Sequence, residues 1–180
     1  MVLPTSPAGL VIAPGAGADA DHSTLVAIEK ALDLPILRLT LRTTSVPRAV
    51  EKIVEAVARF ASELDVATGE LVIGGRSFGG RACSVAASEG LEVAGLLLLS
   101  YPLHPPGKPE KLRVDHFPDI AVPTLFISGE KDPFGSPDEF ATHLPAIPAA
   151  TDMLWVPGAH SPKGNQEGAV VDLVKAALEP

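Results

Sequence analysis

Short apolar runs alternate along this chain with longer segments that have helical periodicity. Six of these runs are predicted as strands, over residues 9–13, 36–41, 71–73, 94–99, 124–127 and 153–156. The runs are apolar at successive positions, which is typical of strands covered on both faces, since a strand with one face in water would alternate. The pattern therefore predicts an α/β three-layer sandwich, in which helices cover both faces of a mostly parallel six-stranded sheet.

Five segments between or after these runs have the spacing of helices. The clearest, 47–64, repeats apolar side chains every three or four residues and carries charged side chains on the opposite face. Ser45 is placed to cap its start, and Pro47 suits the first turn, where a missing N–H costs little. The other predicted helices cover 23–32, 77–88, 137–143 and 167–178.

Composition limits the classes of function that such a chain can have. We expect one domain over residues 1–180, and 46% hydrophobic residues suffice for a substantial core. The 14 Lys and Arg against 22 Asp and Glu give a net charge of −8, which disfavours nucleic acid and acidic membranes as partners. The single cysteine cannot form an internal disulfide, and no secretory leader is recognised. We therefore expect a cytoplasmic protein.

A glycine-rich segment follows the third predicted strand directly and leads into a predicted helix. It reads Gly-Arg-Ser-Phe-Gly over 75–79, which matches the G-x-S-x-G turn that carries a nucleophilic serine. Glycines are needed there because the turn is sharp and neighbouring side chains would collide with the strand or the helix. The alternatives are a plain strand-to-helix turn or a phosphate loop, although the spacing fits neither common phosphate motif. We interpret Ser77 as the catalytic nucleophile.

A serine hydroxyl needs a base to take its proton, and the base needs a carboxylate to orient it. His160 is the only histidine after the last predicted strand, and its turn-forming stretch can hold the imidazole over the sheet edge. Asp132 follows the fifth strand, where its side chain can turn back towards the histidine. The alternatives are an exposed loop histidine, an aspartate that serves only its own turn, and Glu130 as the acid. We predict a triad of Ser77, Asp132 and His160.

The same chemistry needs N–H groups that stabilise an oxyanion. The N–H of Phe78, at the start of a predicted helix, is one candidate. The loop after the first strand should supply the other, and its small residues Ala16 and Gly17 let backbone N–H groups approach a substrate closely. An ordinary tight turn would have the same residues, so both readings of this loop stay open.

Cationic side chains lie close to the predicted site of an otherwise acidic protein. Arg76 and Arg81 flank the serine, and we predict that they bind an anionic substrate; the alternative is that they brace loops by pairing with carboxylates. Tyr101 and His104 begin a Pro-rich stretch over 101–123. They either line the pocket and contact substrate or anchor this stretch through buried hydrogen bonds. Further cations in the loops are Lys108, Lys111, Arg113 and Lys163.

Two other features carry no predicted chemistry. Asp19, Asp21 and His22 could suggest a metal site, but a helix N-cap at Asp21 explains them, so we expect no metal and no other cofactor. Cys83 falls within the predicted helix after the serine, where a small buried hydrophobic role is expected rather than a nucleophilic one.

These motifs resemble the α/β-hydrolase fold, and within it the dienelactone-hydrolase-like branch of small members with little or no lid. The resemblance covers nearly the whole chain and implies triad positions at Ser77, Asp132 and His160. It also implies that the chain opens at the third strand of fuller hydrolases, so that two leading antiparallel strands are absent. The shortened sheet edge would then offer a surface for a homodimer.

A more specific likeness is to the testis-expressed and NSL-complex-subunit group of α/β-hydrolase-like proteins, which includes a scaffold subunit of a eukaryotic histone acetyltransferase complex. The motifs that carry it are Gly-Gly-Arg-Ser-Phe-Gly-Gly-Arg (74–81), Ser-Tyr-Pro-Leu-His (100–104), Lys-Leu-Arg (111–113), Gly-Glu-Lys-Asp (129–132) and Ala-His-Ser (159–161).

The residues together predict a serine hydrolase that cleaves a small ester, lactone or thioester through an acyl-enzyme, with a small acyl substrate as its partner. The chain has little material for a lid, so the site should be shallow and open. A non-catalytic binding or scaffold module with the same fold is the alternative, and acyl transfer to an alcohol or amine is a third reading.

Overall fold

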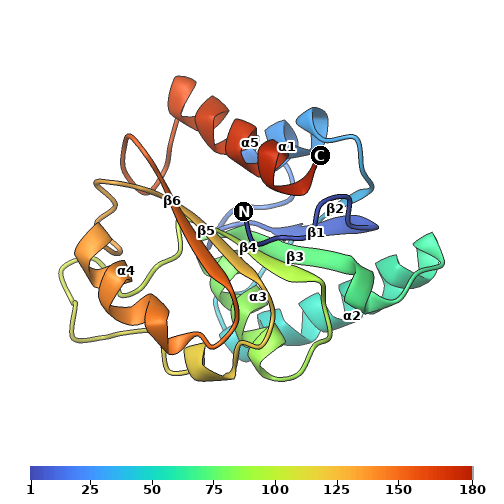
Figure 1. The fold of residues 1–180 in the computed structure, drawn as a ribbon, viewed down its shortest axis with the longest axis horizontal. Coiled ribbons are helices and arrows are strands. Elements are labelled where there is room, and N and C mark those ends of the chain that lie inside the picture. The colour runs from blue at the N-terminus through green and yellow to red at the C-terminus, as the bar shows by residue number, and fades with distance from the viewer. Residues whose placement is uncertain (180) are drawn as a thin grey trace.

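A computed structural model describes residues 1–179 and contains one parallel six-stranded sheet (Figure 1). Its strands are β1 (Gly9–Ala13), β2 (Ile36–Arg38), β3 (Leu71–Arg76), β4 (Gly95–Leu99), β5 (Thr124–Gly129) and β6 (Thr151–Val156). Their order across the sheet is β2-β1-β3-β4-β5-β6, and each neighbouring pair is parallel. The predicted sheet is confirmed, and it is parallel throughout rather than mostly parallel.

Helices cover both faces of this sheet, as predicted. They are α1 (Ser23–Ala31), α2 (Val46–Leu64), α3 (Phe78–Ser88), α4 (Pro137–His143) and α5 (Asn165–Leu178), with short 3-10 turns at η1 (Thr68–Glu70), η2 (Phe117–Asp119) and η3 (Leu144–Ala146). Helices α1 and α5 pack on one face, and α2, α3 and α4 pack on the other (Figure 1). The result is the three-layer arrangement expected from the alternating pattern.

The buried strands explain why the apolar runs show no alternation. Successive side chains of a strand point to opposite faces, so neighbouring residues of β3 enter different cores. Ile73 packs in the cluster formed with α2 and α3, whereas Val72 packs in the cluster formed with α1 and α5. Both side chains are fully buried. A strand that contributes side chains to two cores is therefore apolar at successive positions along its central part.

Helix α2 is amphipathic, as its sequence indicates. Ile53, Val57 and Phe60 are buried against the sheet, and charged residues such as Glu55 face solvent. Ser45 occupies the N-cap position, as predicted, but its side chain makes no capping hydrogen bond. Burial of the apolar stripe is therefore the main contribution to the stability of this helix.

Five strands differ in length from the sequence prediction: β4 starts one residue later, β5 ends two residues later, β6 starts two residues earlier, and the largest differences are in β2 and β3. β2 ends at Arg38, three residues early. The Leu39 N–H still donates to the Ile12 carbonyl oxygen at 2.9 Å, but β1 ends at Ala13, so the pairing stops there. β3 continues to Arg76, three residues beyond the apolar run. Its extension passes through Gly74, where a Cβ would overlap the Leu97 backbone of β4, so only glycine lets the two strands pair at this point.

The N-terminus of α1 corrects another prediction. The N-cap is His22, whose Nδ1 accepts a hydrogen bond from the Thr24 N–H at 3.3 Å. Asp21, the predicted cap, instead forms an ion pair with Arg38 at 3.1 Å. Asp21 lies one residue too early in the chain to reach the free N–H groups of the helix.

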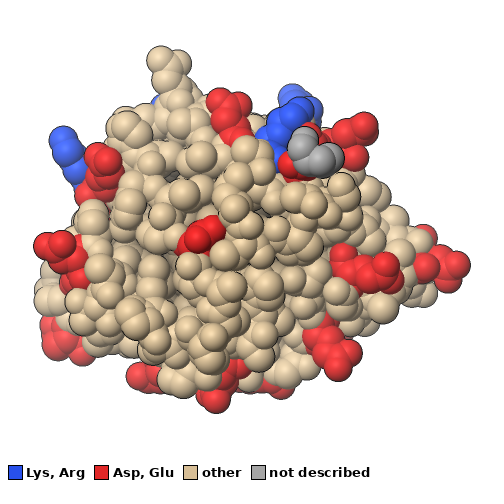
Figure 2. Space-filling view, viewed as in Figure 1, with Lys and Arg blue, Asp and Glu red and all other residues tan. Residues whose placement is uncertain are grey.

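The surface reflects the acidic composition. Figure 2 shows Asp and Glu side chains spread around one face of the molecule, with few Lys or Arg among them. Within residues 1–179, none of the helices has both the length and the apolar character that a membrane crossing requires. Cys83 is fully buried in α3, and burial raises the pKa of its thiol to about 12, as expected for a residue that only packs.

Candidate active site

Ser77 lies in a sharp turn between β3 and α3. Its φ of 51° and ψ of −115° are a backbone conformation that residues with side chains seldom adopt. The turn is held because the Ser77 N–H donates to the Leu99 carbonyl oxygen at 2.8 Å. A Cβ at Gly75 or Gly79 would overlap the carbonyl oxygen of Ala13. The glycines of the motif therefore allow β1 and α3 to close around the turn, and the serine stands at the carboxyl edge of the sheet.

His160 follows β6 and reaches this serine directly. Its Nε2 atom lies 2.9 Å from the Ser77 Oγ atom. Its Nδ1 atom lies 2.8 Å and 3.0 Å from the two carboxylate oxygens of Asp132. When Nδ1 carries the proton and donates to the carboxylate, Nε2 is free to accept the serine proton. The three residues predicted as a triad form one continuous chain of hydrogen bonds.

Asp132 is held rigidly at the end of this chain. Its side chain is 1% exposed, and its Oδ1 atom accepts a hydrogen bond from the Phe134 N–H at 2.9 Å. Glu130, the alternative acid, is exposed at the start of the same loop. Asp132 is therefore the carboxylate that contacts His160.

Phe134 also stacks on the histidine, which sequence reasoning missed. The Phe134 and His160 rings are 4.0 Å apart between centroids and are inclined by 27°. An aromatic ring in this position restricts rotation of the imidazole and keeps water from one of its faces. The only sequence signal is that Phe134 stands two residues after the predicted acid.

Arg76 supports the loop that carries the histidine. Its Nη2 atom donates to the His160 carbonyl oxygen at 2.7 Å and to the Ser161 hydroxyl. The side chain is buried, and burial lowers the pKa of its guanidinium although Asp132 and Glu167 oppose this shift. Arg76 thus braces a loop, as the alternative reading held, but through a carbonyl and a hydroxyl rather than a carboxylate.

A cavity of about 440 Å³ opens above the triad. Ser77, Phe78 and His160 line it, together with Ala16 from the loop after β1. The N–H of Phe78 belongs to the first residue of α3, where backbone donors have no acceptor within the helix. Gly17, the other candidate oxyanion donor, lines a neighbouring cavity instead. The geometry therefore favours Phe78 and Ala16.

Three arginines line the same cavity, namely the two predicted as substrate-binding residues, Arg76 and Arg81, and one that was missed, Arg113. Arg81 comes from α3 and Arg113 from the segment between β4 and η2. In the sequence Arg113 is only one of several loop cations, because nothing in a Pro-rich stretch indicates which side chain faces the site. The lysines noted with it, Lys108 and Lys111, are exposed.

Tyr101 and His104 lie outside the lining of this cavity. The Tyr101 hydroxyl donates to the Arg113 carbonyl oxygen at 2.7 Å, and burial raises the pKa of that phenol. His104 is also buried, with Nδ1 2.8 Å from the Pro105 carbonyl oxygen and Nε2 3.0 Å from a Glu139 oxygen. Both side chains anchor the Pro-rich segment, which is the alternative that the sequence left open for them.

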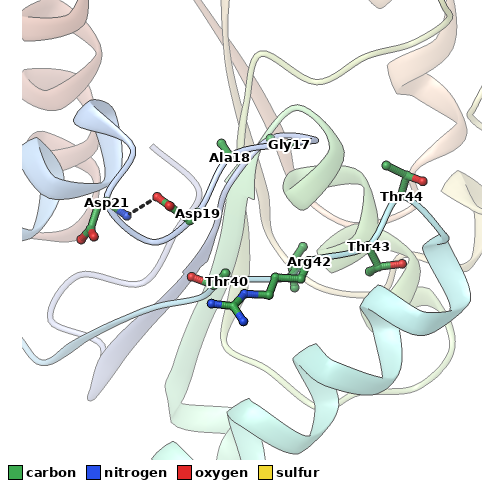
Figure 3. A pocket seen from close by; sticks show the side chains of 10 residues that line it. Gly17, Ala18, Asp19, Asp21, Thr40, Arg42, Thr43 and Thr44 are labelled. Atoms are coloured by element: carbon green, nitrogen blue, oxygen red, sulfur yellow. Dashed lines mark hydrogen bonds between the residues drawn. The ribbon is translucent and has the colours of Figure 1, made fainter.

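A second, larger cavity of about 660 Å³ adjoins the first (Figure 3). Gly15 and Thr44 lie in the lining of both. Figure 3 shows Asp19 and Arg42 among the side chains that line it, and the Asp21 N–H donates to an Asp19 carboxylate oxygen at 3.0 Å. The triad side chains line the smaller cavity, so we take the smaller one as the candidate active site. Among residues 1–179, no three His, Cys, Asp or Glu side chains gather in a way that could hold a metal ion.

Comparison with known proteins agrees with this architecture. A family model described as an alpha/beta hydrolase domain matches residues 6–170. Dienelactone hydrolase from Anabaena variabilis superposes with a TM-score of 0.78 at 18% identity, over 97% of this chain and 87% of that one. Est1E from Butyrivibrio proteoclasticus gives 0.75 at 19% identity, over 96% and 87% of the two chains. The RedJ thioesterase from Streptomyces coelicolor gives 0.69 at 15% identity, over 96% and 91%. At these identities the likeness shows a shared fold.

Proposed function

Because the chain belongs to the alpha/beta hydrolase domain family, we propose that it is a serine hydrolase that cleaves a small ester, lactone or thioester through an acyl-enzyme. One observation carries the proposal, namely the continuous hydrogen-bond chain from Ser77 through His160 to Asp132. A purely structural turn needs neither a serine in a strained conformation nor a histidine held on its hydroxyl.

In the first step the Ser77 oxygen attacks the substrate carbonyl carbon while His160 Nε2 takes the hydroxyl proton. The new C–O bond turns the carbonyl oxygen into an oxyanion, which the N–H groups of Phe78 and Ala16 stabilise. The bond to the leaving group then breaks, and the proton on His160 passes to the departing oxygen or sulfur. Asp132 stabilises the imidazolium throughout.

In the second step water takes the place of the serine hydroxyl. His160 accepts a proton from the water, whose oxygen attacks the acyl carbon, and the released Ser77 oxygen recovers the proton. Product acid and free enzyme result. The cavity volume of about 440 Å³ falls towards the lower end of ligand pockets, which suits a small acyl group.

The motif likeness also supports a place in the testis-expressed and NSL-complex-subunit group. Two of its segments, 74–81 and 129–132, contain the nucleophile and the acid of the proposed triad. The scaffold subunit in that group is the reason to keep a non-catalytic binding module as the second candidate. An assembled triad favours chemistry over that candidate, since a scaffold does not need a base positioned on the serine.

Covalent labelling tests the proposal. A small fluorophosphonate reacts with an activated serine, and the intact mass reports the number of adducts. We expect one adduct on the wild type, none on Ser77→Ala and strongly slowed labelling on His160→Ala. Ser88→Ala, at the far end of α3, is the matched control and should label like the wild type. A folded wild type that takes no label would refute the activated nucleophile and favour the binding module.

A further inference from the structure

Arg81 and Arg113 are the two arginines of the active-site cavity whose side chains bind no group among residues 1–179, whereas Arg76, the third, donates to the His160 carbonyl oxygen and the Ser161 hydroxyl. Within residues 1–179, neither side chain has an ion pair or a hydrogen-bond acceptor, and the buried Nε atom of Arg81 has no partner. Other arginines of this acidic protein do find carboxylates, such as Arg38 with Glu29 and Arg59 with Glu63. Arg42 and Arg48 also have no ion pair among residues 1–179, but they are exposed to solvent, whereas Arg81 and Arg113 are half-buried in the cavity.

The two charges are close enough to oppose each other. Burial lowers the pKa of Arg113, and the positive charge of Arg81 lowers it further. The pKa of the neighbouring His116 is lowered to about 4. Burial is the larger cause, and the positive charge of Arg81 is the second. Bringing two like charges together in a partly buried place is unfavourable unless an anion joins them. Without a ligand, this arrangement does not stabilise the protein. A bound anion would be attracted by both charges.

The backbone of both residues is fixed before any ligand arrives. The Arg81 N–H donates to the Ser77 carbonyl oxygen at 3.0 Å, in the first turn of α3. The Arg113 N–H donates to the Leu103 carbonyl oxygen at 2.8 Å, and its own carbonyl oxygen accepts from the buried Tyr101 hydroxyl at 2.7 Å. The arginines are thus presented by rigid elements to the cavity that holds the nucleophile, which lowers the cost of ordering them on binding.

We propose that Arg81 and Arg113 form a subsite for a carboxylate of the substrate, so that the natural ester, lactone or thioester carries a free carboxylate besides the bond that is cleaved. This inference rests on the proposed function and specifies its substrate class. A guanidinium presents parallel N–H donors that match the two oxygens of a carboxylate, and such charge-assisted bonds are about twice as strong as neutral ones.

Kinetics with three small aryl esters test the subsite and show which end of the substrate it holds. One ester is a hemisuccinate, with the carboxylate on the acyl side. The second is an acetate whose aryl ring carries a carboxylate, on the leaving-group side, and the third is the uncharged acetate. We expect the wild type to prefer one of the charged esters over the uncharged one by about tenfold to a hundredfold in kcat/KM.

Removal of either guanidinium should abolish this preference. In Arg81→Gln and Arg113→Gln, the ratio of charged to uncharged kcat/KM should fall towards one, and Arg113→Lys should restore only part of it because lysine cannot bind both oxygens in parallel. Arg59→Gln, on the exposed face of α2, should keep the wild-type ratio. Equal ratios in Arg81→Gln, Arg113→Gln and wild type would overturn the subsite.

Binding without turnover separates this inference from the proposed hydrolysis. Glutarate, a dicarboxylate with no bond to cleave, should bind to the Ser77→Ala protein in calorimetry, and its affinity should fall by about tenfold or more when Arg81→Gln is added. Glutarate binding without serine labelling would leave the subsite standing and refute the hydrolase. Serine labelling without glutarate binding and without a preference for charged esters would support the hydrolase and refute the subsite. A thermal melt of each variant confirms that it is folded.

Discussion

The Nε2 atom of His160 lies 2.9 Å from the Oγ atom of Ser77, although 83 positions of the chain separate the two residues. The parallel sheet explains how they meet. Strands β3, β5 and β6 all end at one edge, and the residues that follow them are Ser77, the Asp132 loop and the His160 loop. In open α/β sheets this carboxyl edge is where ligands bind. The topology thus brings together three side chains that local sequence could only suggest separately.

The buried carboxylate of Asp132 should be needed for fast ester hydrolysis and for fast labelling of Ser77. In Asp132→Asn the side chain keeps its shape, but an amide can favour the wrong histidine tautomer and cannot stabilise the imidazolium. We expect kcat/KM for an aryl ester, and the rate of fluorophosphonate labelling, to fall by about 10³-fold to 10⁴-fold. Glu130→Gln is the matched control on the same loop and should change neither rate by more than about twofold. A large loss of both rates in Glu130→Gln, with little change in Asp132→Asn, would show that Glu130 is the acid of the triad.

The glycines of the nucleophile turn should tolerate no side chain. In Gly79→Ala the new Cβ would overlap the carbonyl oxygens of Pro14 and Ala13, both on rigid backbone, so we expect a loss of about 1–3 kcal/mol in the free energy of unfolding. Gly168 in α5 is a matched helical glycine with nothing within 4 Å of such a Cβ. Gly168→Ala should therefore stabilise by about 0.5–1 kcal/mol, because alanine loses less backbone entropy in a helix. Urea unfolding of both variants checks the opposite signs.

Much of the site could be predicted because its signals are local. The run of glycines around Ser77 marks a turn wherever it lies, and His160 and Asp132 each follow an apolar strand. Chain order and a parallel sheet then place them at one edge. The end of β3 was missed for a related reason, since Gly74 looks like a turn residue but pairs within the sheet.

Arg113 and Phe134 could not be predicted because their positions depend on how irregular segments fold. Arg113 faces the cavity only because its N–H binds the Leu103 carbonyl oxygen and its own carbonyl oxygen accepts from Tyr101. Phe134 stacks on His160 only because the loop after β5 turns at Asp132. Periodicity says nothing about such loops, whose course is set by hydrogen bonds between distant residues.

The Tyr101 hydroxyl should stabilise the Pro-rich segment rather than take part in the reaction. Tyr101→Phe removes the hydrogen bond to the Arg113 carbonyl oxygen and leaves that acceptor in a buried place. We expect the free energy of unfolding to fall by about 1–2 kcal/mol. The rate of fluorophosphonate labelling, which reports Ser77 and His160, should stay within about twofold of the wild type. A labelling rate that falls with an unchanged stability would place the hydroxyl in the chemistry instead.

His116 should make the stability of the fold depend on pH. Its Nε2 atom lies 2.8 Å from the Ser84 hydroxyl, and burial followed by the charge of Arg81 lowers its pKa from the usual 6.5 to about 4, although Asp115 and Asp119 oppose this shift. The folded state therefore keeps this imidazole neutral at pH values where the unfolded chain already binds a proton. Its contribution to stability is fully present above a pH of about 6.5 and is lost as the pH falls towards about 4.

The comparison that isolates this effect is between the wild type and His116→Gln, which retains a polar group near Ser84 but cannot titrate. Both proteins lose stability in acid as carboxylates become protonated, so the quantity of interest is the difference between their free energies of unfolding, measured in urea from about pH 7 to about pH 4.5. We expect the wild type to lose more stability over this range than the variant. In an Arg81→Gln background the extra loss should shrink without vanishing, because burial, the larger cause, remains. Parallel curves for the wild type and His116→Gln would mean that His116 titrates in the folded protein as it does in the unfolded chain.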